Sequence, residues 1–288
     1  MLMKVEAAVA VGAYLRRERD RLVSREPLVR RDRPGAVKAM RSASRRLRSV
    51  WHTLTETETE TEAGSGGANG GLLAECTWLG EHLGVVRHLD ETAHRVRRHP
   101  GMAGPPARWA IERLARSRDP ARQELLGVLD GARYASLVAV LDAKADAPVP
   151  ESAAVGLGGR FCAAWPPLLD ELAAAAAITD AEARADALHE VRRAAKPLLD
   201  TGRSVARAYP DLLRHPLRRL TALHDLLGEH QDSTVCRRTL EPWPAEAPDR
   251  VVREALRALA EHEWVTAAAA ESRLPALHEE LTALRPGS

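Results

Sequence analysis

The sequence is poor in aromatic side chains, which make up only 3% of its 288 residues and include a single Phe. β-branched residues are also sparse outside short Val and Thr clusters, so the chain offers little from which to build strands. Leu, Ala and Val must therefore fill the core, and a hydrophobic fraction of 45% is enough to build one. Because Ala, Leu and Arg favour helices, this composition predicts an all-α protein.

Cysteines and long apolar runs are scarce as well. Cys76, Cys162 and Cys236 lie far apart and match neither a CxxC motif nor a metal-ligating Cys/His spacing, so we expect reduced thiols in a cytoplasmic protein. The apolar stretch at residues 7–15 is short and lies between charged residues, which does not fit a signal peptide. No segment approaches the roughly 20 apolar residues that span a bilayer, so no membrane partner is expected.

Residues 55–71, with the sequence TETETETEAGSGGANGG, have no apolar position to bury and predict a disordered loop. The Gly-rich end of this segment lacks the Lys-Ser/Thr pair of a phosphate-binding loop.

Helical periodicity, interrupted by Pro and Gly, covers most of the remaining chain. It predicts helices near residues 3–22, 36–54, 72–98, 106–117, 120–144, 151–177, 180–209, 212–240, 249–270 and 274–284. An Ala/Pro linker near residues 145–150 divides the chain into predicted helical units at 1–146 and 147–288. The tryptophans expected to anchor the core or the contact between the units are Trp51, Trp78, Trp109, Trp165 and Trp264.

Two short segments recur in the same order. The tetrapeptide LGEH at residues 79–82 returns at 227–230, an offset of 148, and the spacing Lys38-x-x-Arg41-x-x-x-Arg45 returns from His189 to Lys196, an offset of 151. Two matches at nearly the same offset predict an internal repeat of antiparallel helical bundles related by a pseudo-twofold axis.

The net charge is only +2, but the cations are unevenly distributed. Residues 16–48 carry thirteen Lys/Arg against four Asp/Glu, an excess of nine, while acids gather at residues 55–62 and near the C-terminus. This polarity predicts a basic face.

Within this basic region, Lys38, Arg41, Arg45 and Arg48 occupy positions i, i+3, i+7 and i+10, which share one face of a helix. Like charges stacked along a helix repel one another, and no acid between residues 38 and 48 offsets the repulsion. The stripe therefore predicts an anionic partner.

The second half carries a matching stripe of His189, Arg192 and Lys196, which Arg203 and Arg207 extend to a length of about 27 Å. Either stripe alone is typical of a solvated helix face. Their equivalent positions in the two predicted repeats favour a binding function.

These segments resemble the signatures of the CHAD family, the conserved-histidine α-helical domain. Residues 38–48, KAMRSASRRLR, are similar to the first signature, and residues 188–196, LHEVRRAAK, to the second. Residues 223–232, LHDLLGEHQD, resemble the family's LQDLLGxHQD, and residues 87–90, RHLD, resemble its RDLD. The similarity extends in order over nearly the whole chain.

The resemblance implies two antiparallel four-helix bundles with a basic cavity between them that binds inorganic polyphosphate. It also implies a cytoplasmic protein located at polyphosphate granules, and sulfate or phosphate ions are expected in the same cavity. It implies no catalytic residue, metal or cofactor, and no ExExK motif of the triphosphate-tunnel domain found in some members precedes the helices.

Three positions depart from the family pattern. Lys38 stands at the first family His, which keeps a cation but removes titration near neutral pH. Pro197 replaces a basic residue and predicts a kink or interruption of its helix. Leu199 stands where the family usually has Arg, so the second-half contacts are expected to be weaker or shifted toward Arg203.

Lys and Arg hold a phosphate chain by charge-assisted hydrogen bonds and counterion release. The residues expected to contact phosphate directly are Lys38, Arg41, Arg45, Arg48, Arg87, His189, Arg192 and Lys196. A second group of candidates is Arg46, Arg203, Arg207, Arg218 and Arg219.

Other functions stay open from the residues alone. Nucleic acid is disfavoured because no aromatics are interleaved with the cations and no helix-turn-helix or zinc-finger pattern is present. His224-Asp225 is similar to a metal-dependent phosphohydrolase dyad, and Glu91-x-x-His94 to half of a di-iron motif, but partners at suitable spacing are missing. A protein-binding scaffold is a third alternative.

Overall fold

The computed structural model of the protein describes residues 2–61 and 70–284, and within them the regular structure is entirely helical, which confirms the all-α prediction. The helices, in chain order, are α1 (Leu2–Arg30), α2 (Ala36–Thr61), α3 (Gly70–Arg98), α4 (Pro105–Asp130), α5 (Ala132–Asp146), α6 (Glu151–Ala176), α7 (Ala181–Val205), α8 (Pro210–Leu240), α9 (Trp243–Glu246), α10 (Arg250–Glu271) and α11 (Leu274–Thr282).

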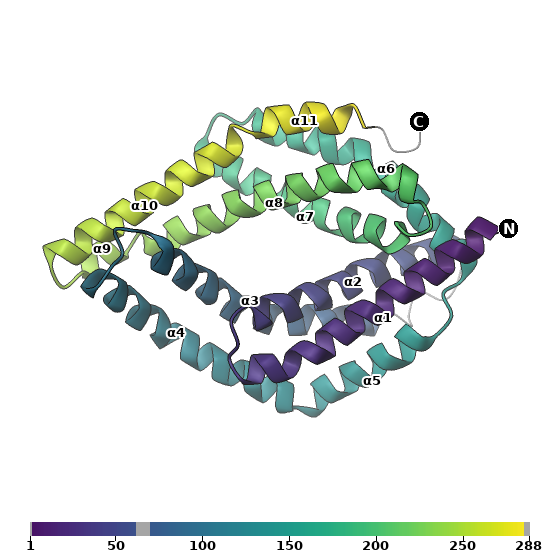
Figure 1. The fold of residues 1–288 in the computed structure, drawn as a ribbon, viewed down its shortest axis with the longest axis horizontal. Helices are drawn as coiled ribbons and strands as arrows, with labels where there is room; N and C mark the ends of the chain where they lie inside the picture. Colours follow the sequence, from purple (N-terminus) through teal and green to yellow (C-terminus); the bar gives the residue numbers. More distant parts are fainter. Residues whose placement is uncertain (1, 62–69, 285–288) are drawn as a thin grey trace.

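The helices form two groups, α1–α5 and α6–α11, which occupy the lower and upper parts of Figure 1. In the first group α1 packs on α2 and α5, and α3 packs on α2 and α4. In the second group α7 packs on α6 and α8, α8 on α10, and α6 on α11. The groups contact each other through α1 and α6, α2 and α7, α3 and α8, and α4 and α10.

The apolar core consists of two clusters, and each draws residues from both helix groups. The larger cluster includes Phe161 and Trp165, whose rings lie 5.6 Å apart. The smaller one lies where α3 and α4 meet α8, α9 and α10, and it contains the edge-to-face pair of Trp109 and Trp243. Helix α5 ends at Asp146, where the predicted boundary lies, but the division into two repeated bundles stays a prediction.

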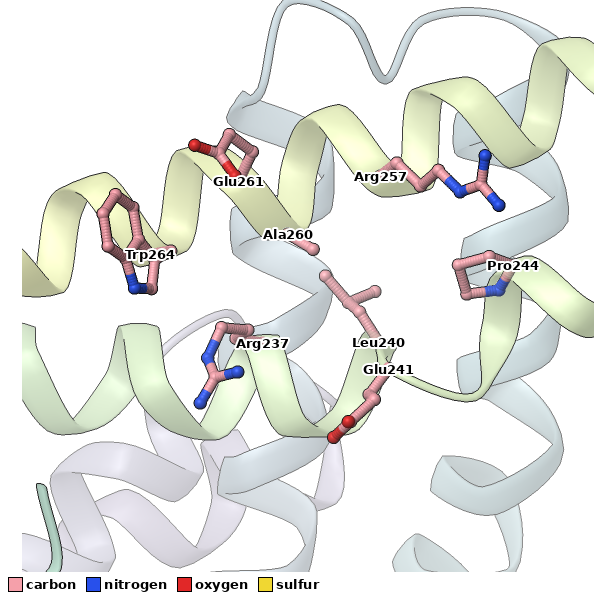
Figure 2. A pocket seen from close by; sticks show the side chains of 8 residues that line it. All are labelled: Arg237, Leu240, Glu241, Pro244, Arg257, Ala260, Glu261 and Trp264. Atoms are coloured by element: carbon pink, nitrogen blue, oxygen red, sulfur yellow. The ribbon is translucent and has the colours of Figure 1, made fainter. Parts of the chain in front are cut away.

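Trp264 does not anchor the core as predicted, because 55% of the residue is exposed. It lies on α10 and lines a cavity of about 530 Å³ together with Arg237 and Leu240 of α8 (Figure 2).

Several predicted helix ends were wrong. Helix α1 continues past residue 22 to Arg30, and α4 passes through Pro120 before a break at Gly131. Pro120 and Arg116 are exposed, so water can reach the carbonyl that the proline leaves without a backbone partner. Helix also occupies residues 55–61 and 70–71 of the predicted loop, whose remaining residues, 62–69, lie outside the described part.

Helix α7, which carries the second basic stripe, is continuous from Ala181 to Val205. It begins where the Asp180 side chain accepts a hydrogen bond from the Ala183 N–H at 2.8 Å. The predicted interruption at Pro197 is absent, and the exposed proline lies inside the helix. The stripe therefore lies on one continuous helix.

No helix of the described residues is long and apolar enough to cross a membrane.

Gly202 allows α7 to approach α6 and α8 closely. A Cβ at this position would lie 2.6 Å from a Phe161 ring carbon and 2.7 Å from a Leu217 methyl carbon. Since Phe161 is fully buried, the ring has little room to move. We expect Gly202→Ala to lower the free energy of unfolding by about 1–3 kcal/mol, measured by urea denaturation.

Gly127→Ala is the matched control, because a Cβ at this exposed position of α4 meets no atom within 4 Å. It should stabilise the protein by about 0.5–1 kcal/mol through helix propensity. Equal effects of the two substitutions would show that the close approach at Gly202 does not limit packing.

Candidate functional site

Cations from both helix groups converge on Lys196 of α7. The basic side chains that lower its pKa are, in order of effect, Arg192 of α7, Arg45 and Arg41 of α2, and Arg87 of α3. Burial is the largest cause, and together these effects lower the pKa of Lys196 to about 7. The two predicted stripes are thus brought together, and we call these five residues the cationic cluster.

Arg41 and Arg192 are held by the same kind of contact. The Arg41 Nε donates to the carbonyl oxygen of Gly80 at 3.2 Å, and its guanidinium lies against Gly84, where a Cβ would be 3.3 Å away. The Arg192 Nη1 donates to the carbonyl oxygen of His224 at 3.0 Å, and its guanidinium lies 3.3 Å from a Cβ built on Gly228.

Through these contacts Gly84 and Gly228 occupy equivalent places, each against one of the two arginines, and they are 144 residues apart in the sequence. The LGEH match instead related Gly80 to Gly228, one helical turn away. Arg41 and Arg192 keep the offset of 151 found in the sequence. The internal repeat as a whole stays a prediction, but this pair of arginines shares one local geometry.

An ion pair of the cluster joins α3 to α8. The Arg87 Nη2 donates to both carboxylate oxygens of Asp232 on α8, at 3.0 and 2.9 Å. Glu91, one turn further along α3, lies 3.8 Å from the same nitrogen and 3.6 Å from the Lys38 ammonium. Asp232 therefore offsets part of the charge, and it raises the pKa of Arg41 and Arg192 against the larger effect of burial.

Two histidines lie beside the cluster as neutral groups. Burial, followed by Arg192, lowers the pKa of His224 to about 4, and its Nε2 lies 3.1 Å from the Arg192 Nη1. Burial and Lys196 lower the pKa of His189, whose Nδ1 is buried without a hydrogen-bond partner among the described residues. His189 therefore carries its proton only at more acidic pH than an ordinary histidine.

A second set of charges is buried between α1, α2 and α7. Asp200 lies 3.6 Å from the Arg45 Nε and 3.8 Å from the Arg46 Nε, and the Arg46 Nη1 donates to Glu18 at 3.2 Å. Both carboxylate side chains are almost completely buried. Burial raises the pKa of Asp200, and the neighbouring arginines oppose this rise.

The remaining candidates are spread over several places. Arg48 donates to Thr77 and lowers the pKa of Arg41, so it borders the cluster. Arg46 is held by Glu18 and Asp200, away from Lys196. Arg219 pairs with Glu280 of α11, and no contact brings the exposed Arg218 to the cluster.

Arg203 and Arg207, near the end of α7, line a cavity of about 240 Å³ against α1. Neither arginine is among the four cations with the largest effect on the pKa of Lys196, but Arg203 lowers the pKa of Arg45, a member of the cluster.

Sequence reasoning missed the acids that accompany the arginines. Asp232 belongs to the recognised LHDLLGEHQD segment, but its role as the partner of Arg87 depends on the crossing of α3 and α8. Asp200 was noted in the sequence as one of the few acids beside the second stripe, and what was missed is its contact with Arg45 and Arg46, which depends on how α2 packs on α7. Glu18 had no signal, because its contact with Arg46 depends on how α1 packs on α2.

Within the described residues, no group of three or more His, Cys, Asp or Glu side chains is arranged to hold a metal ion. The His224 Nδ1 lies 3.2 Å from the Asp225 carboxylate, which is mostly exposed.

Comparison with known proteins shows a family and two solved structures to which this chain is similar. The sequence model of the CHAD domain matches residues 13–241. The crystal structure of the CHAD domain from the plant Ricinus communis is 22% identical with a TM-score of 0.68, covering 97% of this chain and 92% of that one. PptA from Streptomyces chartreusis is 18% identical with a TM-score of 0.70, covering 94% and 99%. No curated protein sequence matches.

The lowered pKa of Lys196 has a consequence for stability. The pKa of a lysine in the unfolded chain is about 10.4. In the folded chain, burial and the neighbouring arginines lower the pKa of Lys196 to about 7. Between these values the unfolded chain binds more protons, so this residue makes stability rise with pH. We expect Lys196→Met to be more stable than the unsubstituted protein at pH 6.5, with the difference shrinking by pH 9, as measured by urea denaturation in the absence of polyanions.

The control is Lys144→Met, on α5. It should leave the pH dependence of stability like that of the unsubstituted protein. A constant difference between Lys196→Met and the unsubstituted protein across this pH range would contradict a lysine that loses its proton near neutrality.

Proposed function

The chain belongs to the CHAD domain family, and we propose that it binds inorganic polyphosphate through the cationic cluster around Lys196. The family is associated with polyphosphate binding. The observation that carries the proposal is the convergence of five cations, from α2, α3 and α7. The carboxylates of Asp232, beside Arg87, and Asp200, beside Arg45, offset only part of this charge.

This arrangement is unfavourable without a counterion. Burial lowers the pKa of Arg41, Arg45 and Arg192, and nearby guanidinium groups lower it further. The free energy of holding like charges in a poorly solvated site falls when an anion with several negative oxygens enters. A phosphate chain supplies such oxygens at regular intervals, which suits cations distributed along two helices.

The chemistry of the residues fits phosphate oxygens. Arginines offer paired N–H donors in a fixed plane, and Lys196 offers an ammonium with three donors. The Arg45 Nε, within the cluster, and the His189 Nδ1, beside it, are buried without hydrogen-bond partners among the described residues. Polyphosphate binding of this kind would bring the protein to polyphosphate granules.

Nucleic acid is the main competitor, because its backbone carries the same phosphate chemistry. The cation–aromatic contacts of the described residues involve Arg17, Arg113, Arg133 and Lys144, none of which belongs to the cluster. Bases would therefore find no stacking surface beside the clustered cations. This favours a ligand that has phosphates and no bases.

The direct test is Arg41→Gln/Arg192→Gln, which removes one cluster charge from each helix group. Each charge-assisted hydrogen bond contributes about 1.5–3 kcal/mol, so we expect at least about a hundredfold loss of affinity for long-chain polyphosphate. The slope of log affinity against log salt should also fall in magnitude by about one to two. Competition between polyphosphate and duplex DNA at physiological salt measures both affinity and preference.

The matched control is Arg116→Gln/Arg250→Gln, which removes the same charge from exposed positions of α4 and α10. Circular dichroism checks that both variants keep their helices. The proposal would be wrong if the two variants bound polyphosphate equally well, or if DNA competed on equal terms with polyphosphate.

Affinity should also depend on pH through Lys196. A bound anion favours the charged lysine and raises its pKa in the complex, so binding takes up a proton when free Lys196 is neutral. Since the pKa of the free residue is lowered to about 7, polyphosphate affinity should fall as pH rises from 6 to 8.5. Fluorescence titration across this range measures the effect.

Lys196→Arg is the control for this pH dependence, because arginine keeps its charge throughout the range. It should remove most of the decrease in affinity. His189→Gln should alter the profile only toward the acidic end, because the pKa of His189 is lowered from its ordinary value. A decrease that persists unchanged in Lys196→Arg would assign the titration to another group.

A further inference from the structure

A cavity of about 240 Å³ lies between α1 and the end of α7, outside the cationic cluster. Its wall consists of Tyr14, Arg17, Arg203, Ser204, Arg207 and two alanines of α1. Three guanidinium groups thus border one small space, and the wall contains no carboxylate. An apolar molecule would leave these donors without partners, so the lining selects for an anion.

The charge around this cavity is not balanced by its neighbours. Two buried carboxylates lie behind the wall, those of Glu18 and Asp200. The arginines that border the cavity or act on these carboxylates are Arg17, Arg21, Arg45, Arg46, Arg203 and Arg207. Six cations against two carboxylates leave an excess of about four positive charges at this end of the molecule.

The arginines of the wall keep donors available. The Arg17 Nε is 3.4 Å from Glu18, and its guanidinium lies 5.0 Å from the centre of the Tyr14 ring. The Arg203 Nη2 donates to the Thr221 hydroxyl, and Arg207 forms no ion pair within the described residues. The planar groups therefore have N–H bonds left for a ligand.

A second observation comes from Tyr14. The residue is only 4% exposed, and its hydroxyl is buried without a hydrogen-bond partner among the described residues. Buried hydroxyls of this kind are rare, because an unmade hydrogen bond costs about 1–3 kcal/mol. Both oxygens of Asp200, which acts on Tyr14, likewise lack a hydrogen-bond partner among the described residues and lie only at ion-pair distance from Arg45 and Arg46. The polar groups behind the wall are thus incompletely satisfied.

We propose that this cavity is a second anion site, which takes a compact phosphate oxyanion between Arg17, Arg203 and Arg207. At about 30 Å³ per water molecule, the space holds about eight waters, which is enough for an anion the size of pyrophosphate. The site goes beyond the proposed function, in which an extended polyphosphate chain contacts Lys196. A small ion in this cavity needs no extended chain and does not contact Lys196. A phosphoryl group at a chain end has the same chemistry as the free ion.

The experiment separates this site from the cluster by using the full chain with Arg41→Gln/Arg192→Gln as background. In this background we expect one equivalent of pyrophosphate to bind, as measured by isothermal titration calorimetry at low ionic strength. Adding Arg17→Gln/Arg207→Gln should weaken that binding by at least about tenfold, because two charge-assisted contacts are lost.

The control adds Arg116→Gln/Arg250→Gln to the same background, which changes the net charge equally at distant exposed positions. It should change the affinity for pyrophosphate by less than about twofold. The proposal is overturned if the background variant, with intact helices, binds no pyrophosphate. It is also overturned if the two added pairs weaken binding equally.

Two further arms identify the source of the anion. Long-chain polyphosphate that displaces pyrophosphate from the background variant would support a site for a chain end. Pyrophosphate that stays bound would support a site for the free ion. Cyclic trimetaphosphate, which has no terminal phosphoryl group, should compete poorly in either case. If Arg41→Gln/Arg192→Gln still bound long-chain polyphosphate as well as the unsubstituted protein, that result would count against the proposed function alone. The second anion site is tested separately, by the binding of pyrophosphate.

Discussion

The structure depends on a repulsion that its apolar packing must overcome. Lys196 is surrounded by Arg41, Arg45, Arg87 and Arg192, and burial adds to the cost of every charge. The helices that carry these residues are fixed by fully buried neighbours such as Leu47. Because the packed core decides where α2 and α7 lie, the cations cannot move apart, and the repulsion between them persists in the folded chain.

Two carboxylates limit this repulsion without removing it. Asp232 neutralises Arg87 across the contact of α3 and α8, and Asp200 lies between Arg45 and Arg46 where α2 meets α7. Each acid is provided by the second helix group and faces arginines of the first. These two acids therefore reduce the repulsion and also join the two groups of helices. The stability of the fold and the net positive charge of the site are connected through them.

The sequence predicted the helical fold and the two basic helix faces because both follow from local periodicity, whereas a basic cavity between the helix groups was only what the resemblance to the CHAD family implied. Arg41, Arg45, Arg192 and Lys196 share helix faces, and a face is determined by spacing alone. Arg46 was harder to place, since one step around α2 takes it toward Glu18 of α1, and long-range packing cannot be read from spacing. The continuation of α4 through Pro120 likewise depended on exposure, which only the structure shows.

Gly84 and Gly228 have a consequence for the entropy of binding. With no side chain at either position, the guanidinium groups of Arg41 and Arg192 rest on helix backbone and hydrogen bond to its carbonyl oxygens. Freezing a mobile arginine costs up to about 2 kcal/mol in lost rotamer freedom. Arg41 and Arg192 have already lost much of this rotamer freedom in the folded chain. If the site binds an anion as proposed, the further loss of conformational entropy falls mainly on the ligand.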